Sequence, residues 1–302
     1  MKLVPRLPRE DVNRSPDGVF KTVSGLFLGA ALIVGIVFVL MSFVVDFTVE
    51  RLDPATEVSL FGDKVSDMME AMGGEGATAA SEEALRTIFD KVVQAGPELP
   101  YDFQLRIACQ EAPNALALPG GGVIVTSGLL DIIETEEELA FILGHELGHF
   151  VHRDHLRGMG RSVAIQLAFG GMFMTSGIDP TIGLQLALEA MSSAHSREQE
   201  IAADETGLHV LALLSPDDVS GAQRALNALH SELEGGVFDA MDFTRSHPLG
   251  PERIAALANK IEQGELNHAK LRGTPLSKAL KEACEGAEAI NNSDEEPEEG
   301  GE

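Results

Sequence analysis

The residues of this chain that could do chemistry begin with the segment His145-Glu146-Leu-Gly-His149. Two histidines four residues apart lie on one face of a helix, so both imidazoles can reach a single metal ion. Glu146 follows the first histidine and is placed to take a proton from a water at the metal. The pattern H-E-x-x-H therefore predicts a zinc site with its general base. Because such a short pattern also arises by chance in amphipathic helices, the rest of the sequence must decide.

A catalytic zinc site needs three protein ligands and an open fourth position, so a further donor is expected downstream. The segment 196–207 supplies Glu200 and Asp204, which stand four residues apart on one helical face. Glu200 can bind the metal. Asp204 can accept a hydrogen bond from a ligand histidine, which fixes the tautomer of that imidazole. Alone, the pair would indicate a solvated helix face, but after the histidine pair it predicts the third ligand and its support.

Three motifs in this order resemble the HtpX/Oma/CAAX-prenyl-protease type of gluzincin zinc metallopeptidases. They are HELGH, the E-x-x-A-D pattern that starts at Glu200, and the stretch from Asn114 to Gly121; together the likeness covers roughly residues 55–265. The resemblance implies a zinc-dependent endopeptidase with one Zn²⁺ per chain. It also implies an edge strand beside the cleft, where Asn114 and Ala115 hold an extended substrate backbone by strand addition. The implied zinc ligands are His145, His149 and Glu200, with Glu146 as the base and Asp204 as the support of a ligand.

The resemblance extends to Ser246-His247-Pro248, which is followed by Arg253. A histidine opposite the base could donate a hydrogen bond to the oxyanion of the tetrahedral intermediate, and we expect this role for His247. A structural histidine packed at a turn is the alternative. The family also has a histidine near position 155, so His155 is expected to support the site. His152 lies close to the helical face of His149 but is interpreted as structural, since the zinc already has its donors.

The elements that must position these residues can be read from the spacing of apolar side chains. The pattern predicts a mainly helical α+β fold with a small β-sheet, as in zincin-type metallopeptidases, rather than alternating βαβ units. A capping box at Thr135 to Glu138 opens the helix that carries the HELGH motif. Helices are expected over 56–72, 81–95, 129–133, 197–214, 217–233 and 251–263, and extended runs over 103–109, 113–118 and 122–126.

An uncharged apolar segment over residues 22–45 is long enough to span a bilayer. Five basic residues precede it, and Arg51 follows it among acidic residues. The positive-inside rule then predicts a cytoplasmic N-terminus and a periplasmic catalytic domain on a single-pass bacterial inner-membrane protein. A secreted peptidase released by cleavage after Val45 is the less favoured alternative. A second apolar region over 162–191 predicts a helical hairpin packed on the domain, with dipping into the membrane as the alternative.

The predicted organisation is a cytoplasmic arm (1–21), a transmembrane helix (22–45), a helical linker that begins the domain (46–100), a metallopeptidase core (101–270) and an acidic disordered tail (271–302). Residues 282–302 carry nine acidic side chains and no basic one, so they cannot bury apolar surface. Cys109 shares the apolar phase of its strand and is expected as a buried thiol. A bridge to Cys284 is not favoured, because Cys284 lies at the edge of the tail.

The formal net charge of −26 argues against nucleic acid as a partner, since phosphate binding needs clustered basic residues. The expected partners are a polypeptide substrate and the membrane. The family resemblance implies that the substrates are unfolded or unassembled envelope proteins, cleaved in quality control. A homo-oligomer or envelope protein partners are left open. The main alternative function is a chaperone-like envelope assembly factor that keeps the zinc fold with little proteolysis.

Overall fold

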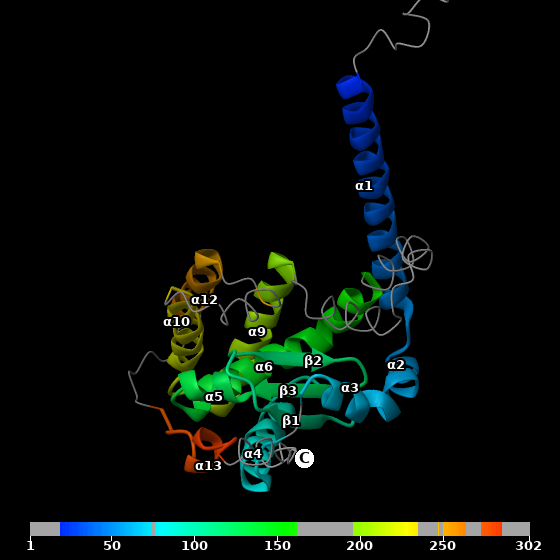
Figure 1. Cartoon of the computed structure of the whole chain (residues 1–302). Helices are drawn as coiled ribbons and strands as arrows, with labels where there is room; N and C mark the ends of the chain where they lie inside the picture. The colour runs from blue at the N-terminus through cyan, green and yellow to red at the C-terminus, as the bar shows by residue number, and fades with distance from the viewer. Residues whose placement is uncertain are drawn as a thin grey trace, which may run out of the picture.

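The computed structural model of the chain describes residues 19–73, 76–161, 196–234, 247, 250–263 and 273–285. The apolar region predicted as a hairpin (162–191) and the cytoplasmic arm lie outside these residues, except that helix α1 begins at Val19. The fold is mainly helical with one three-stranded sheet, so the α+β prediction is confirmed (Figure 1).

Helix α1 (Val19–Arg51) extends away from the rest of the molecule (Figure 1). Many of its large apolar side chains are exposed; they include Leu26, Leu28 and Phe43, with exposed fractions of 70%, 72% and 69%. Within the described ranges, no helix has the combination of length and apolar character that a membrane crossing requires.

The segment after α1 forms three short helical pieces instead of the single predicted helix over 56–72. They are α2 (Pro54–Phe61), the 3₁₀ turn η1 (Gly62–Lys64) and α3 (Val65–Ala71). Asp53 caps α2 by accepting a hydrogen bond from the Ala55 N–H at 3.0 Å, and proline suits the first helical position. The break lets Val65 and Met69 pack onto the sheet, where both are buried.

The sheet has the strand order β1-β3-β2, with β1 at Gln104–Ala108, β2 at Ala115–Leu118 and β3 at Gly122–Thr126. Strand β1 pairs in parallel with β3, and β2 pairs with β3 in antiparallel register, Leu116 opposite Ile124. Alternate residues face opposite sides of a sheet. Ala115 and Ala117 therefore lie in the main core, whereas Leu116 and Leu118 pack with α3 in a second cluster.

Helix α6 (Glu136–His152) carries HELGH and packs against α9 (Arg197–Leu214) in the main core. The two backbones approach closely because glycine lies at the contact. A Cβ atom on Gly148 would come within 2.7 Å of the Ala203 Cα atom, and one on Gly207 within 2.8 Å of the Phe141 carbonyl oxygen. This packing requires residues without side chains at both positions. Thr135 caps α6 through the Glu138 N–H, while Ser196 and Gln199 form a full capping box on α9.

Four further helices have bounds close to those expected. They are α4 (Ala79–Ala95), α5 (Ser127–Ile132), α10 (Ser220–Glu234) and α12 (Pro251–Gln263). Leu85, Phe89 and Val92 of α4 and Leu257 and Ile261 of α12 belong to the same buried core as α6.

The start of the predicted tail is part of the folded domain, which corrects our prediction for residues 273–285. Helix α13 (Lys278–Lys281) lies beside α4 in Figure 1, and the Lys281 ammonium donates to the carbonyl oxygens of Leu130, Asp131 and Ile133 at 2.6 to 3.0 Å. These carbonyls end α5 and lack helical partners, which a cation can satisfy. Residues 286–302 lie outside the described residues.

A disulfide joins Cys109 to Cys284, so the expectation of a buried free thiol is wrong. The Cα atoms are 5.7 Å apart, within the range that a disulfide needs. The cause is the packing of the C-terminal segment: the Thr78 N–H donates to the Ala283 carbonyl at 3.0 Å, which brings Cys284 to the end of β1. The sequence did not indicate this contact, because the two cysteines are 175 residues apart and Cys284 lies at the edge of the acidic tail.

Candidate active site

Four side chains from three segments meet between α6 and α9. His145 and His149 project from α6, Glu200 projects from the first turn of α9, and His247 joins them from a separate segment. Their potential ligand atoms all lie within 4.8 Å of one another, and all four residues are buried. The Nε2 atoms of the two α6 histidines are 3.1 Å apart and lie 3.5 to 3.6 Å from the Glu200 carboxylate. The structure thus brings together the three residues predicted as ligands.

Asp204, predicted to support a ligand histidine, lies one turn after Glu200 and contacts His145. Its Oδ1 atom is 2.9 Å from His145 Nδ1, so the Nε2 atom faces the other ligands. Arg253, to which the sequence assigned no role, binds the carboxylates of both Asp204 and Glu200. Its guanidinium donates to Asp204 at 2.7 and 2.9 Å and pairs with Glu200, although the side chain is only 2% exposed.

His149 has a carboxylate partner that sequence reasoning missed. Asp154 Oδ2 lies 3.0 Å from His149 Nδ1 and is fully buried. Helix α6 ends at His152, and Arg153 adopts a left-handed conformation (φ 57°, ψ 35°) that turns the chain back toward the helix. A left-handed residue commonly ends a helix in this way. The sequence shows that Asp154 lies two residues beyond the end of the helix. It does not show that the Asp154 side chain points back to His149, because that depends on the conformation of Arg153.

Glu146 is buried beside these residues, with an exposed fraction of 1%. Burial raises its pKa, against the lowering effects of His247, His145 and the backbone amide of Ala117 on β2. His247 Nε2 is 3.7 Å from Glu146 Oε1.

His247 is buried and lies beside the candidate ligands. Its Nδ1 atom is 3.1 Å from Glu200 Oε1 and 3.3 Å from His145 Nε2. Although burial opposes the change, the carboxylates of Glu200 and Glu146 raise the pKa of His247. Burial likewise opposes ionisation of Glu200, but His247, His145 and Arg253 lower its pKa to about 2.

The chemistry of this donor set fits a first-row transition metal. Two imidazoles and a carboxylate are hard-to-intermediate ligands that such ions accept, and each α6 histidine presents Nε2 to the centre while Nδ1 contacts an aspartate. Glu146 also lies within the same buried space. These residues therefore form a candidate metal site.

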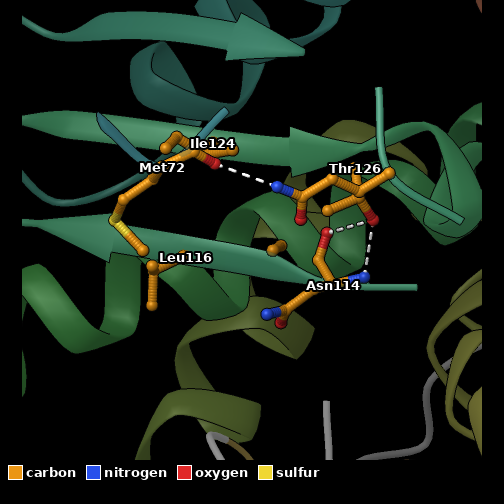
Figure 2. A pocket seen from close by; sticks show the side chains of 7 residues that line it. Met72, Asn114, Leu116, Ile124 and Thr126 are labelled. Carbon is orange, nitrogen blue, oxygen red and sulfur yellow. Dashed lines mark hydrogen bonds between the residues drawn. The ribbon is translucent and has the colours of Figure 1, made fainter. Parts of the chain in front are cut away.

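Strand β2 is the edge of the described sheet and lies next to Glu146. Figure 2 shows Asn114 bound to Thr126 Oγ1, which accepts from the Asn114 N–H at 2.7 Å and lies 3.1 Å from the Asn114 carbonyl oxygen. The Thr126 N–H also donates to that carbonyl, at 2.9 Å. In an antiparallel pair the backbone groups alternate in direction. The groups of Ala115 and Ala117 therefore point away from β3. Of Asn114 and Ala115, the two residues predicted to bind substrate, Ala115 presents its backbone to the edge, and so does Ala117.

The opposite face of β2 bears a cavity of about 30 Å³, bordered by Met72, Leu116, Ile124 and Thr126 (Figure 2). The Gln110 side chain closes one end by donating to the Met72 carbonyl at 3.0 Å. This space is about that of a single water molecule.

His155 contacts none of the candidate ligands through the interactions seen in the described residues. It pairs instead with Glu57 of α2, with Nε2 2.7 Å from Oε1. The direct support that we expected from His155 is therefore supplied by its neighbour Asp154. His152 is partly exposed and borders a groove of about 470 Å³ with Glu205 and His209, away from the ligand cluster.

Comparison with known proteins places this arrangement in a family. The chain is 31% identical over 156 residues to the mitochondrial metalloendopeptidase OMA1 of Arabidopsis thaliana, which covers 50% of this chain and 30% of that protein. It is 30% identical over 158 residues to the metalloprotease YcaL of Escherichia coli (50% and 59%). It is 28% identical over 210 residues to protease HtpX of Legionella pneumophila strain Corby (54% and 71%).

The first two of these relatives are thus matched over less than two thirds of their own length. The model of the peptidase family M48 matches residues 79–261, which include α4, the sheet, α6, α9 and His247. Because this match spans more than half of the chain and contains every residue of the candidate site, the chain belongs to peptidase family M48.

Proposed function

We propose that this chain is a zinc-dependent metalloendopeptidase. The observation that carries the proposal is the buried cluster of His145, His149, Glu200 and His247 beside Glu146. We assign the zinc to the two α6 histidines and Glu200, as catalytic zinc sites keep three protein ligands and an open position. Asp204 and Asp154 would hold the histidines so that Nε2 faces the zinc.

The residues around the zinc have distinct parts in peptide hydrolysis. Zinc, when bound, lowers the pKa of a water ligand and polarises a carbonyl. Glu146 accepts the proton of the attacking water and passes it to the leaving amine. Its pKa, raised by burial, makes it a stronger base than an exposed glutamate. His247 donates a hydrogen bond to the oxyanion, and its raised pKa favours the protonated form that can donate.

The substrate class that suits the edge of the sheet is an extended polypeptide. A substrate strand added to β2 would hydrogen-bond to the backbone of Ala115 and Ala117, with Asn114 at the start of the strand. Pairing along a strand requires a stretch of chain free of its own secondary structure. We therefore infer that unfolded or unassembled proteins of the cell envelope are cleaved.

We also propose that residues 22–45 anchor the domain as a single-pass segment in the bacterial inner membrane. The support is the uncharged apolar run and the excess of basic residues before it. Exposed apolar side chains on α1 add to it, since lipid is a favourable surrounding for them. This orientation puts the catalytic domain in the periplasm, where the disulfide would be stable.

The test is digestion of unfolded casein by the purified protein, with and without a zinc chelator, beside Glu146→Gln. We expect the wild type to cleave casein only with zinc, and Glu146→Gln to bind zinc but lose at least about a hundredfold in kcat because the base is gone. Glu198→Gln, the same change at an exposed site on α9, is the matched control and should keep full activity. Full activity in Glu146→Gln would exclude the assignment, and loss of zinc there would mean that the residue is structural.

A further inference from the structure

A fully buried carboxylate outside the candidate metal site connects the end of the edge strand β2 to the segment that follows helix α6. Glu57 of α2 has an exposed fraction of 0% and accepts from four donors in other parts of the fold. They are the Tyr101 hydroxyl at 2.8 Å, the Gly120 N–H at 3.2 Å, the Arg153 guanidinium at 3.2 Å and His155 Nε2 at 2.7 Å. Burial alone would favour the neutral acid, but these donors, chiefly His155, lower the pKa of Glu57 to about 2. Glu57 is therefore an ionised carboxylate at a junction, defined here as the contact of α2 with the turn after β2 and the segment after α6.

One side of the junction is the end of the edge strand. Gly120 follows β2 in a left-handed conformation (φ 88°), and a Cβ atom there would come within 2.9 Å of Phe61 and Val65. Only glycine fits both the conformation and the close approach. The turn at Gly120 therefore packs against α2 and α3, and the Gly120 N–H reaches Glu57. The carboxylate thus fixes where β2, with Ala115 and Ala117, lies relative to α2.

The other side of the junction is the segment that ends the metal-binding helix. Arg153 and His155 both contact Glu57, and between them Asp154 contacts the candidate ligand His149. Arg153 also donates to the carbonyls of Val49 and Leu52 at the end of α1. Residues 153–155 therefore connect the end of α1 and Glu57 of α2 to the candidate ligand His149.

We propose that Glu57 is a positioning residue for the peptidase reaction, which sets the place of the edge strand relative to His149 through Gly120 on one side and Asp154 on the other. The inference rests on the proposed zinc site and substrate edge. A carboxylate with four donors defines one geometry, because moving either side by an ångström breaks charge-assisted hydrogen bonds. A purely structural role would affect stability alone, whereas a positioning role affects the metal and the substrate as well.

The experiment compares the full-length wild type with Glu57→Gln, which keeps the shape but presents an amide group to some of the four donors. Zinc affinity is measured by competition with a chromophoric chelator, at a temperature where circular dichroism shows both proteins folded. We expect the zinc Kd to rise about tenfold, at the lower end of what loss of a ligand's outer partner causes. The visible spectrum of the Co²⁺-substituted protein should shift, and KM for a casein-derived peptide should rise.

Glu70→Gln is the matched control, because it makes the same change at an exposed site on α3 and should leave all three measurements unchanged. If Glu57→Gln does not fold, Tyr101→Phe is measured instead, since it removes one donor to Glu57 and keeps the ring contacts with Phe103 and Phe150. Smaller changes in zinc affinity, spectrum and KM in the same direction support the proposal. Zinc affinity, spectrum and KM equal to those of the wild type in the folded variant would overturn it. A wild type that binds no zinc would instead defeat the proposed function, and this inference with it.

Discussion

At the residue scale, each α6 histidine has its own aspartate, and the two aspartates are held differently. Asp204 receives two hydrogen bonds from the buried Arg253, whereas Asp154 is contacted by Gln199 and by Arg157, which is partly exposed. An aspartate with fixed partners can fix an imidazole more firmly than one with mobile partners. The support of His145 therefore includes a buried cation, whereas that of His149 includes partly exposed side chains.

The proposed role of His247 makes a prediction about a single side chain. We expect His247→Ala to retain zinc and to lower kcat about a hundredfold or more, as for loss of one oxyanion donor. KM should change little, because the hydrogen bond strengthens in the transition state. Zinc content is measured by metal analysis of the purified protein and kcat by peptide cleavage. Loss of zinc would identify His247 as a fourth ligand, in keeping with its 3.1 Å distance from Glu200, and would exclude the donor role.

The candidate ligands could be predicted from sequence because helical spacing is local. His145 and His149, and likewise Glu200 and Asp204, share a face by counting residues alone. Asp154 and Arg253 could not be assigned in this way. The direction of Asp154 depends on the left-handed turn at Arg153, and Arg253 reaches the site from α12, whose packing no local pattern specifies.

At the element scale, the distance between α6 and α9 fixes the distance between the histidines and Glu200. That distance depends on the contact of Gly148 with Ala203. Gly148 of the HELGH motif and Gly207 of α9 were visible in the sequence, but their role in the packing was not, since it depends on the partner helix. The short helical pieces α2, η1 and α3 were also unpredictable from periodicity, because the apolar spacing continues across the break at Gly62.

We predict that Gly148→Ala loosens the metal site by separating these helices. Its Cβ atom would meet backbone atoms of Ala203 at 2.7 to 3.1 Å, which cannot move without α9. Overpacking of this kind costs about 1 to 3 kcal/mol of unfolding free energy, and zinc affinity should fall with it. Urea unfolding and chelator competition measure the two effects. Gly62→Ala is the control: its nearest contact would be an ordinary 3.6 Å, so stability should stay the same or rise. Equal zinc affinity in Gly148→Ala would show that the helix distance does not control the site.

The disulfide makes a prediction about the C-terminal segment. Replacing Cys109 and Cys284 together with serine should lower the unfolding free energy by about 2 to 4 kcal/mol, because the bridge closes a long loop in the unfolded chain. Reduced wild type should unfold at the same urea concentration as the double variant, and dithiothreitol should not affect the variant. Two titratable thiols in unreduced wild type would show that the bridge does not form.

At the scale of the whole molecule, charge and covalent structure point to the same surroundings. A net charge of −26 repels nucleic acid and anionic surfaces, so in the proposed anchoring the apolar segment, not electrostatic attraction, would hold the domain at a membrane. A disulfide between residues 175 positions apart persists in oxidising compartments. Both observations agree with a periplasmic domain tethered through its N-terminus.

The tether predicts how the chain fractionates and where its cysteines are oxidised. In bacterial cells, the full chain should remain in the membrane pellet after an alkaline carbonate wash and leave it only with detergent, because apolar burial in lipid does not depend on charge. A chain that starts at Asp46 should be soluble. In the full chain the cysteines should resist a maleimide reagent until reduced, since the positive-inside rule places them outside the cytoplasm. Neutralising Lys2, Arg6, Arg9, Arg14 and Lys21 should weaken this orientation and expose reactive thiols in part of the population. Full release by carbonate, or free thiols in the unaltered chain, would contradict the anchor and its direction.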